Sequence, residues 1–116
     1  MTYRIPKINS LLQRELSELL REAKDPRLAT MVTVTKVSTL PDLSHSTVLV
    51  SIMGAAEEKD NVMKALSSAS GFLRKSLSSR VTLRRVPELE FVGDDSIERG
   101  AHLLELIDQA VKTDQH

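Results

Sequence analysis

Residues 31–53 read MVTVTKVSTLPDLSHSTVLVSIM, and this stretch decides the fold. It holds two runs rich in β-branched residues, 31–38 and 45–53, in which apolar and polar side chains alternate as in strands with one buried face. A short turn-forming sequence separates the runs, so we expect them to pair as an antiparallel hairpin. Strict alternation places Val34 and Val37 on opposite faces of the first strand.

A helical pattern precedes this hairpin. Over residues 5–23, apolar side chains recur every three or four positions and therefore line one face of a helix. Asp25-Pro26 ends the pattern, because the residue before a proline is pushed out of the α conformation. We expect no further regular structure before the first strand.

A longer helical pattern follows the hairpin, from about residue 57 to Leu77. Its middle is weak, because serine and glycine both lower helix propensity. We therefore expect a kink, or a break between two helices, at Ala69, Ser70 and Gly71.

The remaining elements complete an α+β architecture. Residues 89–92 predict a short third strand. Asp95 and Glu98 have the form of a capping box at the start of a final helix over 97–111. The predicted order is α-β-β-α-(kink)-α-β-α, with a three-stranded sheet packed against helices. We expect one domain over 1–112.

Composition excludes several classes of protein. The chain has 116 residues, 41% of them apolar, which suits one globular domain with a frayed tail at 113–116. There is no cysteine, and the three histidines are scattered, so we expect no disulfide and no metal site. No signal-peptide pattern and no membrane-spanning stretch is present, which makes a cytoplasmic protein the expectation.

Enzyme motifs are also missing from the sequence. No serine lies in a nucleophile-elbow pattern, and four glycines do not form a phosphate-binding loop. Asp94, Asp95 and Glu98 are suited to holding Mg²⁺, but helix capping explains them without a metal. We therefore expect no catalytic activity and no cofactor.

The net charge of zero hides an uneven distribution. Residues 61–87 carry six cations and no acid, whereas residues 88–116 carry two cations and eight acids. Such asymmetry indicates a basic binding face on a counter-charged remainder. The alternative is a solvated cationic helix that only neutralises the acidic segment.

The basic segment suggests phosphate binding. If a second helix starts near Gly71, its free N–H groups form an anion site beside Arg74 and Lys75. The small residues there would equally suit close packing of a neighbouring element. Phe72 and Phe91 are expected on apolar faces, which leaves few aromatic rings for stacking on bases. The candidate phosphate ligands are Arg74, Lys75, Arg80, Arg84 and Arg85, extended by Arg4, Lys7 and Arg14.

Seven short strings, in order, resemble one family over about residues 4–110. They are RELSELL (14–20), KDPRL (24–28), VTVTKV (32–37), DLSH (42–45), ASGFLR (69–74), LRRVPEL (83–89) and DDSIERG (94–100). The chain is similar to bacterial ribosome-binding factor A. The resemblance implies a type II KH-like fold, in which an Ala-x-Gly kink at 69–71 replaces the Gly-x-x-Gly loop that clamps nucleic-acid backbone in ordinary KH domains.

The resemblance also implies a function. It indicates a non-enzymatic factor that binds the 30S subunit and 16S rRNA in late maturation and supports 5′-end processing and growth in the cold. We expect a monomer with no small-molecule substrate and no membrane partner. The alternative is a protein-interaction module that acts through its N-terminal or C-terminal helix.

Overall fold

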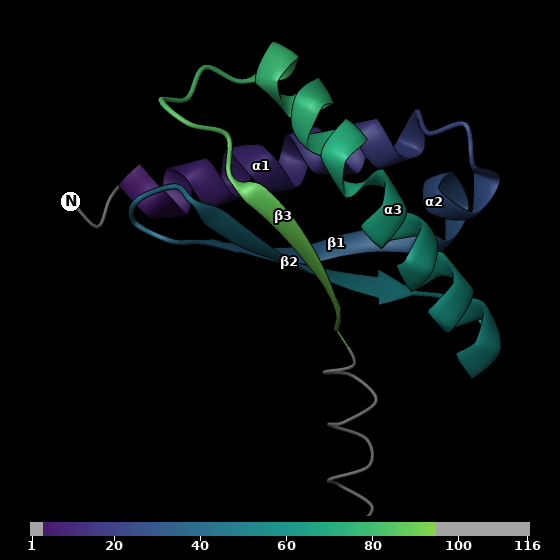
Figure 1. The fold of residues 1–116 in the computed structure, drawn as a ribbon. Coiled ribbons are helices and arrows are strands. Elements are labelled where there is room, and N and C mark those ends of the chain that lie inside the picture. Colours follow the sequence, from purple (N-terminus) through teal and green to yellow (C-terminus); the bar gives the residue numbers. More distant parts are fainter. Residues whose placement is uncertain (1–3, 95–116) are drawn as a thin grey trace, which may run out of the picture.

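The computed structural model describes residues 4–94 (Figure 1). All five elements predicted within this range are present, four of them within a residue or two of their expected bounds and the long helix three residues longer at its end, and one short helix is additional. In chain order the elements are α1 (Arg4–Arg21), α2 (Pro26–Met31), β1 (Val32–Thr39), β2 (His45–Ile52), α3 (Ala56–Arg80) and β3 (Glu88–Gly93).

The three strands form one mixed sheet in the order β1-β2-β3. The predicted antiparallel hairpin of β1 and β2 is confirmed, with Val32 opposite Ile52 and Thr39 opposite Ser46. β3 pairs with β2 in parallel, Phe91 lying opposite Val48. A parallel neighbour needs a crossover connection, and α3 provides it.

A β-bulge corrects the predicted faces of β1. The register shifts between Val34 and Lys36, so one extra residue lies in this strand. As a result Val34 and Val37, three residues apart, are both buried on the same side. The strict alternation expected from the sequence is therefore wrong at this point.

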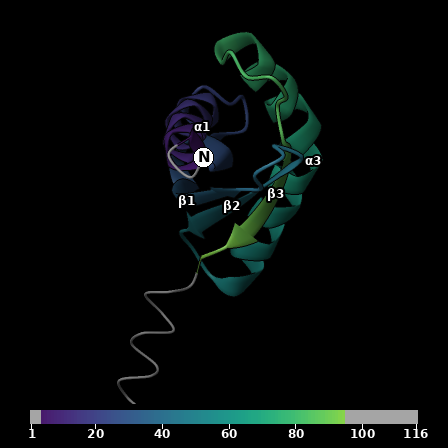
Figure 2. The same ribbon diagram turned by 90° about the vertical axis from the view of Figure 1, so that its left-hand side faces the viewer.

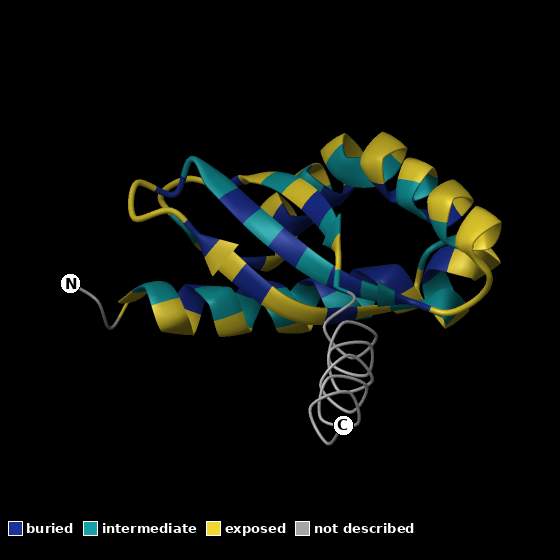
Figure 3. Cartoon of the chain, turned by 90° about the horizontal axis from the view of Figure 1, so that it is seen from below, coloured by how far each residue is buried: buried dark blue, intermediate teal, exposed yellow. Residues whose placement is uncertain are grey.

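α1 and α3 lie on one face of the sheet, above β1 and β3 respectively (Figure 2). The apolar stripe of α1 packs into this layer, where Leu12 and Leu16 have no exposed surface. Leu66 and Leu77 of α3 are as fully buried. Figure 3 shows the opposite face of the sheet, which no described helix covers. The core therefore lies between the sheet and the two long helices.

Two helical details differ from the sequence-based expectation. Asp25-Pro26 ends the pattern of α1, as predicted, but it also starts α2, where the Asp25 carboxylate accepts a hydrogen bond from the Arg27 N–H at 3.0 Å. α3 is a single helix that continues through Ala69, Ser70 and Gly71. The predicted break into two helices is wrong, because the apolar stripe stays in phase with the core on both sides of Gly71.

Glycine has a defined role at the entry to α3. Gly54 has φ +119°, and a Cβ atom at this position would lie 2.8 Å from the Glu58 side chain. Glycine alone tolerates both constraints. The predicted final helix, with Asp95, Glu98 and the tail, lies outside the described residues. No helix within residues 4–94 is long and apolar enough to cross a membrane.

Candidate nucleic-acid interface

Three segments that are distant in sequence lie at the same end of the molecule. They are the start of α1, the turn between β1 and β2, and the segment 81–87 between α3 and β3 (Figures 1 and 2). The N–H of Glu88 donates to the carbonyl of Ser44 at 3.1 Å, which joins the last two. Leu43 is buried despite a positive φ of 61°, so packing holds the turn in this conformation.

The carboxylate of Asp42 organises the β1–β2 turn. It accepts hydrogen bonds from the Ser44 hydroxyl at 2.6 Å and from the Ser44 N–H at 3.0 Å. These bonds hold the pKa of Asp42 below its ordinary value, and the nearby positive charge of Arg85 lowers it further. Asp42 therefore stays ionised beside Arg85 at neutral pH.

Arg84 and Arg85 are exposed on the segment 81–87. Pro87 is buried at the end of this segment, and the half-buried side chain of Arg74 donates from its Nε to the carbonyl of Val86 at 3.1 Å. Arg74 was predicted as a phosphate ligand, and the structure gives it this additional task. It fixes the backbone that carries the two exposed arginines.

The predicted cations of α1 are also accessible. Arg4 and Lys7 are exposed in its first two turns. Lys7 and Arg14 line one shallow hollow of about 390 Å³ on the outer side of the helix. Arg14 lies 3.6 Å from Glu15 and keeps most of its side chain in solvent. Lys75 is exposed on the outer side of α3.

Arg80 differs from the other predicted ligands. Its guanidinium contacts three carboxylates of α1: Glu22 at 2.6 Å, Glu18 at 3.3 Å and Glu15 at 3.4 Å. With three acids around one cation, this position repels a phosphate rather than attracting one. We therefore leave Arg80 out of the proposed phosphate ligands, because its ion pairs join α3 to α1.

The anion site expected at Gly71 is absent as well. Because α3 is continuous there, the N–H groups of this turn are inside the helix and are not free. The expected close approach of a neighbour is also wrong at Gly71, because a Cβ atom would meet nothing within 4 Å. A role of Ala69, Ser70 and Gly71 in bending the helix axis stays a prediction.

Phe72 is the residue that sequence reasoning misjudged. It was expected on an apolar face, but 70% of it is exposed. Its position contained the signal, because the buried stripe of α3 runs through Val62, Leu66, Leu73 and Leu77 and leaves Phe72 beside it.

The described residues contain no group of three side chains suited to holding a metal. His45 Nε2 lies 3.0 Å from a Glu90 carboxylate oxygen on the neighbouring strand, which is the geometry of a cross-strand polar pair. What remains is a set of exposed cations on the start of α1 and on the segment 81–87, namely Arg4, Lys7, Arg84 and Arg85, which we name the basic end. Asp42 and Glu88 are the acids that the contacts above place beside it.

Comparison with known proteins agrees with this picture. The family model described as "Ribosome-binding factor A" matches residues 4–107. The ribosome-binding factor A of Acetivibrio thermocellus is 44% identical over 91% of this chain and 87% of its own length. That of Pseudomonas syringae is 45% identical over 97% of this chain and 84% of its own length.

Solved structures are similar too. The crystal structure of ribosome-binding factor A from Thermus thermophilus matches with a TM-score of 0.68 and 34% identity, covering 77% of this chain and 93% of that one. A Thermus thermophilus homology model, fitted into the cryo-EM map of a 30S complex of that factor, matches with a TM-score of 0.63 and 33% identity, covering 75% and 91%. The α+β, KH-like fold expected from the resemblance is thus confirmed, and the chain belongs to the ribosome-binding factor A family.

Proposed function

We propose that this protein binds the small ribosomal subunit and contacts the phosphates of 16S rRNA through the basic end. Arg84 and Arg85 are the main ligands, and Arg4 and Lys7 extend them. Lys75 and Arg14 lie on neighbouring outer surfaces and add weaker contacts, while Arg74 holds the backbone of 81–87. The observation that carries the proposal is that Arg4, Lys7, Arg84 and Arg85 are exposed on segments that lie at one end of the molecule (Figure 2).

Electrostatics explains how a neutral chain binds a polyanion. Each phosphate contact releases condensed counterions, so a few cations at one end are enough for affinity that falls with salt. Glu15, Glu18 and Glu22 of α1 converge on Arg80, and three acids around one cation make this junction unfavourable for phosphate. Their placement restricts RNA binding to one part of the surface.

The proposal is tested by a pair of double variants with equal charge change. Arg84→Gln with Arg85→Gln removes two cations from the basic end, and Arg21→Gln with Lys36→Gln removes two exposed cations elsewhere. Binding to isolated 30S subunits is measured over a range of salt concentrations. The first pair should lower affinity at least about tenfold and reduce the slope of log K against log salt by about two, whereas the control should change little.

Two outcomes of this experiment would contradict the proposal. Equal losses from the two pairs would mean that net charge alone governs binding. Unchanged affinity in the first pair would place the subunit contact on another surface.

The biological role we propose is assembly rather than catalysis. The protein acts as a cytoplasmic monomer of one domain over 1–112 in late 30S maturation, and it supports processing of the 5′ end of the 16S precursor and growth in the cold. In cells that lack the factor, the wild-type chain should restore mature 5′ ends at low temperature and the Arg84/Arg85 variant should not. Restoration by both would contradict the role of the basic end.

A protein-interaction module remains the second candidate function. The apolar stripe of α1 does not favour it, because that stripe is buried in the core. The C-terminal helix predicted over 97–111 lies outside the described residues.

A further inference from the structure

The turn between β1 and β2 carries an exposed apolar pair, Leu40-Pro41. Leu40 is 50% exposed, and Pro41 is exposed beside it. Leucine has no special role in turns, unlike glycine, proline, asparagine, aspartate and serine. The turn uses the backbone of Leu40, whose N–H donates to the His45 carbonyl and whose carbonyl accepts from the Leu43 N–H, both at 2.9 Å. The Leu40 side chain is therefore available to a ligand without disturbing the turn.

Residues 40–42, which we name the hairpin tip, are carried by a fixed backbone. The hydroxyl groups of Thr39 and Ser46 form a buried hydrogen bond of 2.8 Å at the base of the turn. Leu43 is buried, and the carbonyl of Ser44 accepts from the N–H of Glu88 at 3.1 Å. A preorganised loop loses little conformational entropy on binding. The hairpin tip is therefore suited to a contact that depends on shape.

The charges around the hairpin tip favour a polyanion. The positive charge of Arg85 acts on Asp42, the acid of the tip, and partly offsets it. Arg84 precedes Arg85 and is exposed, and the other cations of the basic end lie at the same end of the molecule (Figure 2). Apolar side chains flanked by arginine and lysine are typical of proteins that enter the minor groove of a nucleic-acid helix.

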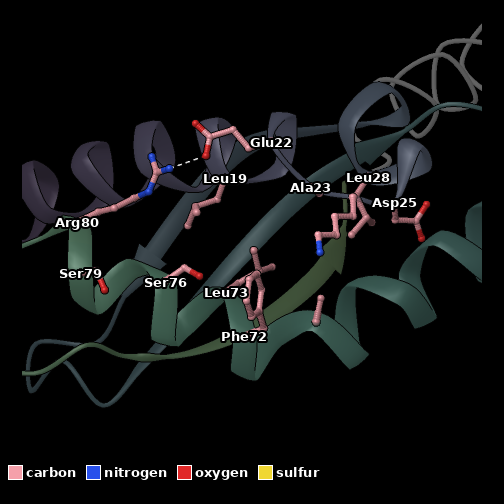
Figure 4. A pocket seen from close by; sticks show the side chains of 12 residues that line it. Leu19, Glu22, Ala23, Asp25, Leu28, Phe72, Leu73, Ser76, Ser79 and Arg80 are labelled. Carbon is pink, nitrogen blue, oxygen red and sulfur yellow. Dashed lines mark hydrogen bonds and ion pairs between the residues drawn. The ribbon is translucent and has the colours of Figure 1, made fainter.

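The described part of the basic end has no aromatic ring for stacking on unpaired bases. Phe91 is buried in the core. Phe72 is exposed, but it lines a groove of about 650 Å³ between the end of α1, α2 and the middle of α3 (Figure 4). Arg80 lines the same groove and is shared by three carboxylates of α1, so phosphate is unfavourable there. Proteins that bind single strands combine cations with stacking rings, so the basic end better suits a double helix, whose bases are already stacked.

We propose that the hairpin tip lies in the minor groove of an rRNA double helix, where Leu40 and Pro41 contact the sugar edges and the arginines of 81–87 hold the flanking phosphates. The inference rests on the proposed function and names the form of RNA that the basic end binds. The minor groove of an RNA helix is wide and shallow, so a hairpin tip reaches its floor. That of B-form DNA is only about 6 Å wide. It excludes two paired strands, which lie about 4.8 Å apart before their side chains are added.

The test compares three ligands: a short RNA duplex, a DNA duplex of the corresponding sequence, and an oligouridine with the same number of phosphates. The wild-type chain should bind the RNA duplex most tightly, about fivefold above the DNA duplex, because the exposed half of Leu40 leaves water only in the wide groove. Leu40→Ser should abolish this preference and leave the salt slope unchanged. Leu40→Met should retain the preference, because it keeps an apolar side chain of similar size.

Met53→Ser is the matched control, because Met53 is 69% exposed and follows β2 at the opposite end of that strand from the turn. It should keep the wild-type preference, and circular dichroism should show that every variant is folded. Equal affinity of the wild-type chain for the two duplexes would overturn the inference, as would tighter binding of the oligouridine or an unchanged preference in Leu40→Ser. A Leu40→Ser variant that loses 30S affinity but keeps the preference for the RNA duplex would assign the hairpin tip to a ribosomal protein.

The outcomes separate this inference from the proposed function. Arg84→Gln with Arg85→Gln should weaken binding to both duplexes and reduce both salt slopes by about two, with the preference for RNA kept. If these arginines are required for 30S binding while Leu40→Ser keeps the preference, only the placement of the hairpin tip is wrong. If Leu40→Ser abolishes the preference but the Arg84/Arg85 variant binds 30S normally, the proposed function is wrong.

Discussion

Arg80 and Arg84 are four residues apart in the same acid-free segment, yet they have opposite surroundings. Arg80 ends α3 and lies among three carboxylates of α1, with 28% of its side chain exposed. Arg84 stands in the next segment and is exposed. The comparison teaches that a run of cations is not one surface. One arginine joins α1 to α3, and the others are exposed at the basic end, where we propose that they bind RNA.

The largest expected effect concerns the core under the junction. Leu77 is fully buried one turn before Arg80. Leu77→Ala should lower the free energy of unfolding by about 2–5 kcal/mol, because it leaves a cavity that the surroundings fill only in part. Urea denaturation measures this loss. The folded fraction should still bind 30S subunits with wild-type affinity, and a loss of intrinsic affinity would show that junction and basic end are coupled.

A smaller effect separates the two arginines directly. Arg80→Ala leaves Glu15, Glu18 and Glu22 close together without their cation, so stability should fall by about 1 kcal/mol. Added salt should restore part of it by screening the carboxylates. Arg84→Ala should change stability by less than about 0.5 kcal/mol. Thermal melts at low and high salt give both values, and equal melting temperatures for the two variants would refute the distinction.

The smallest effect lies at the basic end and depends on pH. The pKa of Asp42 is lowered in the folded state, chiefly by the Ser44 hydroxyl. A carboxyl with a lowered folded pKa stabilises the protein above its unfolded pKa, and this stabilisation is lost as pH falls through the folded value. Asp42→Asn should therefore lower stability slightly at neutral pH and flatten its decrease below about pH 4. If the stability of the variant decreased at low pH as steeply as that of the wild type, the pKa of Asp42 would not differ between the folded and unfolded states.

Asp42→Asn also tests whether the negative charge beside Arg85 weakens binding to 30S subunits. It removes a negative charge beside Arg85, so affinity for 30S subunits should rise slightly at low salt and converge with the wild type at high salt. A decrease in affinity would indicate that the turn geometry, rather than the charge, matters most.

Much of the fold was predictable because its signals are local. Alternation of β-branched residues marks the hairpin, and three-to-four spacing marks α1. The bulge at Val34 was not predictable by alternation, because it depends on how β1 pairs with β2. The break expected at Gly71 was wrong because packing of Leu66, Leu73 and Leu77 outweighs the weak propensity of the serine-rich turn.

For the candidate site, the sequence predicted which charged residues are candidates but not how the fold arranges them. The sequence places Arg80 in one group with the arginines of 81–87, although Arg80 contacts Glu15, which lies 65 residues away in sequence. Phe72 shows the same limit. Because it is apolar and aromatic, Phe72 was expected in the core. Its position in the helical repeat of α3 instead places it outside the buried stripe.

By itself, the sequence determined the type of each long element, the family, and the concentration of cations between 61 and 87. Those properties depend on neighbours within a few turns of chain, where spacing and propensity act. Only the tertiary structure decided which arginine is neutralised, that 81–87 lies against the β1–β2 turn, and that an exposed Phe72 overlooks a groove. These outcomes depend on contacts between distant segments, because the pairing of charges and the exposure of side chains to solvent are properties of the packed surface.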